Sequence, residues 1–207
     1  MNETINDFPS QYFYNGNLKP ALSAVNRKLK LTNISNQYSK ILDPNLPSVF
    51  VDLAHKGMSI RCDEEADLVA KLVCEAIECG VPPYEIAVVV PFRAQARLIK
   101  NKLQRLPIGI TPMELKSIVI DTVERIQGQE RELILISLTA SDAKYIDENA
   151  RFFLNPNRLN VAITRAKTKR IVVGSRFLFD RKHKNPKYQA ALDVFKAFYE
   201  SCEKIFI

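Results

Sequence analysis

The sequence predicts the α/β class, with an open, mostly parallel sheet and helices on both of its faces. Short apolar runs without polar alternation, such as IAVVV at residues 86–90, are typical of strands that are buried on both sides. Amphipathic segments with helical spacing separate these runs, and strands that alternate with helices favour parallel pairing. In open sheets of this kind, ligands bind outside the carboxyl ends of the strands.

Five segments have the composition of short strands. Each is rich in Val, Ile, Leu or Phe, as expected for the centre of a covered sheet. The predicted strands are residues 48–53 (SVFVDL), 86–90 (IAVVV), 117–121 (SIVID), 133–138 (LILISL) and 170–174 (RIVVG).

Four amphipathic segments predict the helices. Asp63 opens the first and Gly80 closes it, with apolar residues repeating at helical spacing between them. The third has its apolar stripe at Leu159, Ala162, Ile163 and Ala166. The four predicted helices are residues 63–79, 93–106, 157–167 and 187–203.

Changes of composition divide the chain into three parts. Residues 1–47 contain turn signals and a polar stretch rich in Pro and Asn, so we expect an irregular N-terminal segment. The strand and helix pattern occupies residues 48–180, and residues 181–207 form a helical extension.

Composition excludes several classes of protein. The chain has 207 residues, 46% hydrophobic and 26% charged, with 30 Lys+Arg against 23 Asp+Glu and a formal net charge of +7. These values exclude collagen, low-complexity disorder and a disulfide scaffold. No apolar run approaches the roughly 18 to 20 residues that span a bilayer. We therefore expect no membrane contact and no secretion, and a cytoplasmic location, or a nuclear one in a eukaryote.

The four cysteines do not predict a metal site. Cys62, Cys74, Cys79 and Cys202 show no two-residue zinc-knuckle gap, and neither histidine is near them in sequence. We interpret them as packing residues.

The phosphate-binding loops of common nucleotide enzymes are absent. The chain contains no G-x-x-x-x-G-K-[ST] and no G-x-G-x-x-G, so it does not cradle a nucleoside triphosphate by those loops. The polar residues near the strands thus form one side of a site whose other side lies elsewhere.

Two groups of polar residues are the candidates for that site. Arg158 and Arg165 are seven residues apart on the helix predicted at 157–167, and the arginine fork suits a phosphate or carboxylate. Gly128 permits close approach to the backbone, and Glu130 can accept hydrogen bonds from sugar hydroxyls. From spacing alone, a solvated arginine face and a simple glycine turn remain open alternatives.

Four stretches together resemble the second RecA-like domain of superfamily 1B helicases. The resemblance is to the group that contains the nonsense-mediated-decay helicase and the replication helicase-nucleases, and it covers about residues 1–180. The matching stretches are VVVPFRAQARLI (88–99, motif IV), DTVERIQGQERELILISL (121–138, motif V), RLNVAITRAKTKRIVVG (158–174, motif VI) and MNETINDFPSQYFYNGNL (1–18), which is similar to the stretch after the Gln-Tyr-Arg-Met element.

The resemblance implies a P-loop-type domain that lacks its own P-loop and completes an ATP site. Arg165 matches the motif VI arginine finger, the catalytic residue that reaches the γ-phosphate. Glu130 matches the residue that contacts the ribose, with Gly128 allowing the approach. Arg158 belongs to the same nucleotide-binding set, where it orients this region. ATP and Mg²⁺ would be held mainly by the first RecA-like domain of the same polypeptide.

The resemblance also implies a grip on single-stranded DNA or RNA. Thr122 matches a motif V hydroxyl that contacts the nucleic-acid backbone, and Arg93 and Gln95 of motif IV face the strand or the cleft. Asn160 couples motif VI to this side. Glu124 and Ile126 depart from the usual Asp and aromatic residue of motif V. The family favours 5′ to 3′ movement, whereas DNA and RNA are not distinguished.

The expected function is therefore that of the C-terminal motor domain of an ATP-dependent helicase. The chain starts just inside its own family element, so we expect the 207 residues alone to be inactive. Two other readings remain open. One is a stand-alone regulatory or nucleic-acid-binding module without ATPase activity, and the other is a small-molecule α/β enzyme with a complete pocket. The basic residues of the helix at 93–106 are either nucleic-acid contacts or a solvated face.

Overall fold

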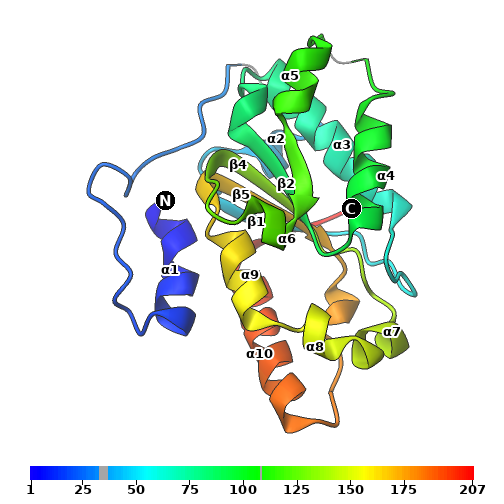
Figure 1. Ribbon diagram of the computed structural model, residues 1–207. Helices are drawn as coiled ribbons and strands as arrows, with labels where there is room; N and C mark the ends of the chain where they lie inside the picture. Colours follow the sequence, from blue (N-terminus) through cyan, green and yellow to red (C-terminus); the bar gives the residue numbers. More distant parts are fainter. Residues whose placement is uncertain (33–36, 108) are drawn as a thin grey trace.

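Six strands form a single sheet in which every described pair is parallel, in the order β3-β2-β4-β5-β1-β6 (Figure 1). The computed structural model describes residues 1–32, 37–107 and 109–207. The strands are β1 (Ser48–Asp52), β2 (Ile86–Val90), β3 (Val119–Thr122), β4 (Arg131–Ser137), β5 (Ala166–Gly174) and β6 (Glu203–Phe206).

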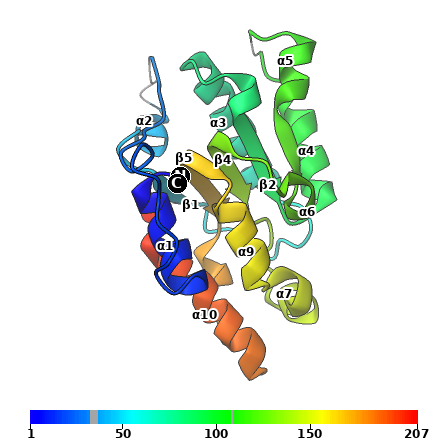
Figure 2. The same ribbon diagram turned by 60° about the vertical axis from the view of Figure 1, so that its left-hand side comes forward.

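Helices cover both faces of this sheet (Figure 2). The α-helices are α1 (Glu3–Phe13), α2 (Ser39–Leu42), α3 (Asp63–Glu78), α4 (Arg93–Leu103), α5 (Pro112–Ser117), α6 (Val123–Ile126), α7 (Ala143–Glu148), α8 (Ala150–Phe153), α9 (Pro156–Ile163) and α10 (Pro186–Ser201). One core cluster packs α2, α3 and α4 on the sheet, and the other packs α1, α9 and α10. The predicted α/β class with helices on both faces is confirmed.

The two cores explain why the strands read as continuous apolar runs. In β2, Ile86, Val88 and Val90 belong to one cluster, and Ala87 and Val89 belong to the other. Successive side chains of a strand point to opposite faces, so a strand that is covered on both sides has no position for a solvated residue.

The helix predicted at 157–167 is shorter than expected. It ends at Ile163 with Thr164 as its C-cap, and Ala166, which fits the apolar stripe, is instead the first residue of β5. Pairing of Arg131 with Ala166 extends the β4–β5 ladder back to this point. Arg165 therefore lies in the tight connection between α9 and β5.

The N-terminal segment is not irregular throughout, because residues 3–13 form α1. Pro9 lies inside this helix and has no N–H to donate to the carbonyl of Ile5. Nη1 of the fully buried Arg170 on β5 donates to that same carbonyl at 3.3 Å. A lost helical hydrogen bond is thus replaced by one from the sheet, which docks α1 on the domain.

The C-terminal extension contains a strand as well as a helix. The helix predicted at 187–203 ends at Ser201, and β6 then pairs with β1 along the edge of the sheet. No helix in the described part of the chain is long and apolar enough to cross a membrane.

Candidate functional site

The predicted site residues separate to opposite edges of the sheet. Glu130 directly precedes β4 and Arg165 directly precedes β5, so both lie at the amino edge of the parallel strands. Thr122 ends β3 and Arg93 follows β2, so both lie at the carboxyl edge. The expectation that the polar candidates gather outside the carboxyl ends is therefore wrong for Glu130 and Arg165.

At the amino edge, hydrogen bonds join the loop before β4 to the connection before β5. The backbone N–H of Arg131 donates to the carbonyl of Arg165 at 3.0 Å. The guanidinium of Arg131 also donates to the carbonyl of Glu130 at 3.0 Å and to Oε1 of Gln129 at 3.1 Å. The two family elements that hold Glu130 and Arg165 are thus held side by side.

The guanidinium of Arg165 folds back along α9. Its Nε donates to the carbonyl of Val161 at 3.0 Å, and its Nη2 donates to Oγ1 of Thr164 at 3.1 Å. Within the described residues, the structure gives Arg165 no ion pair, and its side chain is half-buried. No carboxylate among the described residues therefore neutralises the positive charge, which can meet an anion from outside.

Gly128 adopts a φ of +82°, which L-residues with a side chain rarely take. A Cβ at this position would meet no atom within 4 Å. The glycine is thus required by the turn, and the space beside it is open to a neighbouring group. Both interpretations left open by the sequence agree with this geometry.

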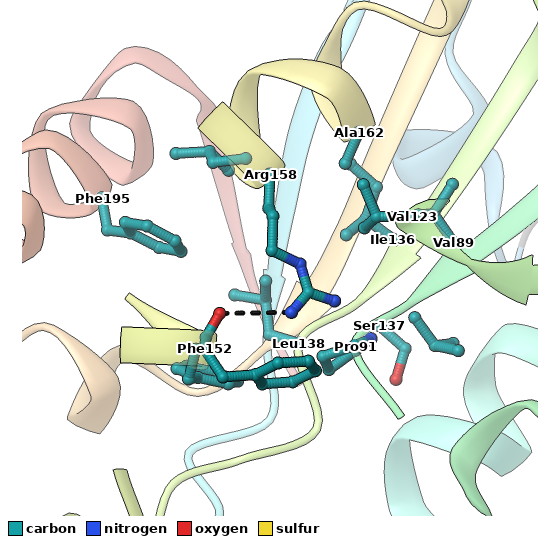
Figure 3. A pocket seen from close by; sticks show the side chains of 13 residues that line it. Val89, Pro91, Val123, Ile136, Ser137, Leu138, Phe152, Arg158, Ala162 and Phe195 are labelled. Carbon is teal, nitrogen blue, oxygen red and sulfur yellow. Dashed lines mark hydrogen bonds between the residues drawn. The ribbon is translucent and has the colours of Figure 1, made fainter. Parts of the chain in front are cut away.

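Arg158 and Arg165 do not share a site, contrary to the expectation from their spacing. The guanidinium of Arg158 lies 3.7 Å above the ring of Phe152 and donates to its carbonyl at 3.3 Å (Figure 3). Its Nη2 pairs with Glu124 at 2.9 Å. Because α9 runs from the carboxyl edge to the amino edge, Arg158 in its first turn and Arg165 just beyond its end lie at opposite edges.

The cavity under Arg158 is too small for a nucleotide. It has a volume of about 50 Å³, and its walls are apolar residues from the ends of β2 and β4 and from α8 to α10 (Figure 3). Such a volume corresponds to only a few water molecules, far less than a nucleotide. We interpret it as a packing feature that supports Arg158.

A larger groove lies at the carboxyl edge, with a volume of about 480 Å³. Arg93 and Arg125 supply positive charge, Glu124, which pairs with Arg158, supplies a carboxylate, and Phe92, Phe152 and Ile60 supply apolar surface. Thr122 lines the same groove, although it is 7% exposed. Cations interleaved with aromatic rings are the chemistry that binds single-stranded nucleic acid.

Two of the predicted nucleic-acid residues do not line this groove. Gln95 is fully buried: its Nε2 donates to the carbonyl of Cys62 at 3.0 Å and to Oγ of Ser137 at 3.1 Å, and its Oε1 accepts from the N–H of Cys62. Nδ2 of Asn160 donates to the hydroxyl of Tyr14, on the side of α9 that faces α1. The structure thus contradicts a direct contact for Gln95 and places Asn160 apart from Arg93.

Sequence reasoning missed a buried polar cluster beneath the groove. His55 Nε2 lies 2.7 Å from Oε1 of Glu65, and both side chains are buried. Burial by itself lowers the pKa of His55, but contacts with Cys62 and Glu65 outweigh it and raise the pKa to about 10. A signal was present in the sequence, because Glu65 is four residues before Val69 and so falls in phase with the apolar stripe of its helix.

The arrangement of strands and helices defines a class of protein: a RecA-like α/β domain without a P-loop of its own. The family model AAA_12, described as an AAA domain, matches residues 1–177. The chain belongs to this family and is a helicase-family domain of superfamily 1B.

Three named relatives illustrate the similarity. Regulator of nonsense transcripts 1 of Caenorhabditis elegans is 31% identical over 182 residues, which cover 84% of this chain and 16% of that protein. The DNA replication ATP-dependent helicase/nuclease JHS1 of Arabidopsis thaliana is 32% identical over 149 residues, which cover 69% of this chain and 10% of that protein. DNA polymerase alpha-associated DNA helicase A of Saccharomyces cerevisiae is 31% identical over 188 residues, which cover 84% of this chain and 26% of that protein. The chain thus spans about a quarter or less of each.

A solved structure also resembles the chain. It is the C-terminal domain of a possible DNA helicase from Lactobacillus plantarum, with a TM-score of 0.41 and 14% identity, and the match covers 70% of this chain and 87% of that one.

Proposed function

We propose that this chain is the C-terminal RecA-like motor domain of an ATP-dependent helicase or translocase that moves on single-stranded nucleic acid. The observation that supports the proposal most is that Glu130 and Arg165 lie at the same edge of the sheet, where the backbone N–H of Arg131, the residue after Glu130, donates to the carbonyl of Arg165. An exposed carboxylate and an arginine without an acidic partner, next to an open glycine turn, suit the ribose and phosphates of a nucleotide.

In this proposal the first RecA-like domain of the same polypeptide holds ATP and Mg²⁺. Arg165 leaves Thr164 and Val161 when the two domains close, and its guanidinium offsets the negative charge that develops on the γ-phosphate. In related systems such an arginine contributes about 10³ to 10⁵ in rate. Glu130 accepts hydrogen bonds from the ribose hydroxyls, beside the open turn at Gly128.

The opposite edge of the sheet holds the nucleic acid. Arg93 and Arg125 contact phosphates along the groove, the hydroxyl of Thr122 contacts the backbone, and the aromatic surface of Phe152 lies against the bases. Contacts of this kind position a strand without reading its sequence. Because β4 and its neighbours connect the two edges rigidly, closure on ATP moves the groove along the strand.

ATP turnover tests the nucleotide half of the proposal. We expect no turnover by the 207-residue chain alone and nucleic-acid-stimulated turnover by the chain joined to a first RecA-like domain. In the joined protein, Arg165→Ala lowers kcat by at least about 10³-fold. Arg105→Ala, an exposed arginine beyond the end of α4, is the matched control and leaves kcat unchanged. Equal turnover by wild type and Arg165→Ala contradicts the proposal, as does turnover by the isolated chain that Arg165→Ala abolishes.

Binding of labelled single strands tests the other half. We expect salt-sensitive binding of a DNA or RNA 20-mer in fluorescence anisotropy, because the groove neutralises phosphates. Arg93→Ala reduces the slope of log affinity against log salt by about 0.7, the value for one phosphate contact on a single strand. Arg105→Ala leaves the slope unchanged. An affinity that does not depend on salt contradicts the groove, and comparison of the two oligonucleotides decides between DNA and RNA.

A further inference from the structure

Donors from two loops at the carboxyl edge of the sheet converge on one buried carboxylate. Glu65, in the first turn of α3, is fully buried. Its Oε2 accepts from Oγ of Ser137 at 2.6 Å, and its two oxygens accept from the N–H of Thr139 at 3.0 and 2.9 Å. His55 lies 2.7 Å from its Oε1. Glu65 is therefore the point at which the loops after β1 and β4 meet.

A second layer of hydrogen bonds extends the cluster to the loop after β2. Gln95, in the first turn of α4, bonds both to Ser137 and to the backbone of Cys62. Nδ1 of His55 lies 2.8 Å from Oγ of Ser141. The carbonyl of Met58 accepts from the N–H groups of Ser141 and Asp142, both at 2.8 Å. Three loops are thus tied to one another beneath the groove.

The backbone at this junction is in an unusual conformation. Thr139 has a φ of +69°, an outlier for a β-branched residue, and it is fully buried. Such conformations persist only where the surroundings enforce them. The carboxylate of Glu65 is the group that holds the N–H of Thr139 in place.

The cluster is built as a hydrogen-bonded network and not as a metal centre. One ligand atom each from His55, Cys62 and Glu65 lies within 4.8 Å of the others. Both imidazole nitrogens and both carboxylate oxygens already bond to protein groups. A metal would have to displace these bonds.

The residues that this network positions line the groove. Ile60 follows Met58 in the first loop, and Arg93 begins the helix that contains Gln95; both line the 480 Å³ space, to which the loop after β4 is tied through Glu65 and Met58. We propose that Glu65 is a positioning residue that holds the three carboxyl-edge loops in the one arrangement that binds a single strand. The ligand named here rests on the proposed function, whereas the loop coupling does not.

Glu65→Gln is the variant that isolates this role. The glutamine side chain has nearly the same shape, but its amide NH₂ would face donors at Ser137 and Thr139. We expect amide hydrogen exchange at Thr139, Ser141 and Asp142 to accelerate at least 100-fold, with exchange in β2 changed by less than threefold. The neighbouring exposed Glu64→Gln is the matched control and changes neither.

The same variant has a distinct signature in binding. We expect affinity for the single-stranded 20-mer to fall about tenfold, because binding must then order loops that Glu65 no longer holds in place. The salt slope stays unchanged, because the phosphate contacts remain. Arg93→Ala, in contrast, changes the slope. Ser137→Ala removes the link to Gln95 and one of the donors to Glu65, while both bonds from the N–H of Thr139 remain. It serves if Glu65→Gln does not fold: exchange then accelerates at Cys62 and Gln95.

The possible outcomes separate the two proposals. If wild type binds neither oligonucleotide, the proposed function fails while hydrogen exchange still tests the coupling. If wild type binds and Glu65→Gln binds equally well, Glu65 does not position the groove. Unchanged exchange, a uniform acceleration that includes β2, or one zinc per chain in native mass spectrometry overturns the inference.

Discussion

The two edges of the sheet each bury a basic side chain, and they stabilise it in opposite ways. At the amino edge, Nζ of Lys169 donates to the carbonyls of Asp43 and Leu46 at 2.9 and 2.6 Å. Burial lowers the pKa of Lys169 to about 7, and the charge of Asp43 offsets only part of this. At the carboxyl edge, His55 lies against Glu65, and its pKa is raised to about 10.

This comparison shows that the structure of the carboxyl edge depends on a buried charge, whereas that of the amino edge does not. At the amino edge, the backbone N–H of Arg131 donates to the carbonyl of Arg165, and this bond does not change when the side chain of Glu130 or of Arg165 is replaced. The groove of the carboxyl edge rests on a buried ion pair. We therefore expect the amino edge to tolerate substitutions that the carboxyl edge does not.

The largest expected contrast is between two glutamates. Glu65→Ala leaves the charge of His55 buried without a partner, and breaking a buried pair costs about 3–5 kcal/mol of unfolding free energy. Glu130→Ala, at the exposed position, changes it by less than about 0.5 kcal/mol. Urea unfolding of both variants measures the difference. Equal losses would mean that the two edges do not differ in the way described.

The pH dependence of stability gives a contrast of intermediate size. Lys169 has a lowered pKa, so between about pH 7 and 10.5 the unfolded chain binds more protons than the folded chain, and this residue makes stability rise with pH. His55 has a raised pKa, so between about pH 6.5 and 10 the folded chain binds more protons, and stability falls with pH.

Because these two contributions oppose each other, each is revealed by removing the other. Lys169→Met is expected to make the melting temperature fall more steeply between pH 7 and 9.5 than it does in wild type. His55→Gln has the opposite effect on the slope. Thermal melts at pH 7, 8.25 and 9.5 are sufficient, and a Lys169→Met profile parallel to wild type would show that the ammonium is not desolvated.

A smaller contrast separates the two arginines of motif VI. Arg158→Ala removes the stack on Phe152, the pairing with Glu124 and the packing of the side-chain stem, for about 1–2 kcal/mol. Arg165→Ala removes only bonds to its own helix end, for less than about 0.5 kcal/mol. Urea unfolding again measures both. A larger loss of unfolding free energy for Arg165→Ala would mean that Arg165 stabilises the fold and is not held free to bind a ligand.

The smallest contrast concerns the glycine turn of the amino edge. Gly128→Ala places a side chain at a φ of +82° in open space, so we expect a loss of about 1 kcal/mol from backbone strain alone. Gly109→Ala, also in open space but without a positive φ, is the control and changes stability by less than about 0.5 kcal/mol. If the two variants are equally stable, the turn at Gly128 is not strained by a side chain.

The sequence was sufficient for the parts of the fold that local patterns determine. Apolar runs such as 86–90 located the buried strands, because no solvated face competes in them. The end of α9 was misplaced because Ala166 suits a helix stripe and a buried strand equally well. The helix at residues 3–13 was missed because turn signals and a polar stretch dominate residues 1–47, and the bond from Arg170, far along the chain, that compensates for Pro9 leaves no local pattern.

The candidate site was likewise predictable from the sequence only in part. Motif spacing located Glu130 and Arg165, which lie together because their strands are neighbours. It did not separate Arg158 from Arg165, since the edge that a residue faces depends on where the helix ends. The cluster around Glu65 joins residues up to 74 positions apart, such as Glu65 and Thr139, and no local pattern contains that information.

The strand order also determines when each strand can first pair during synthesis of the chain. Among the described strands, β1 has β5 and β6 as its neighbours, and both are made more than a hundred residues later. At about 5–20 residues per second, the apolar strand at 48–52 waits roughly 6 to 24 seconds on the ribosome before its first neighbour exists. During that interval its backbone is unpaired and its Val49, Phe50 and Val51 side chains lack their sheet partners. An apolar strand whose neighbours do not yet exist exposes the kind of surface from which nascent chains aggregate.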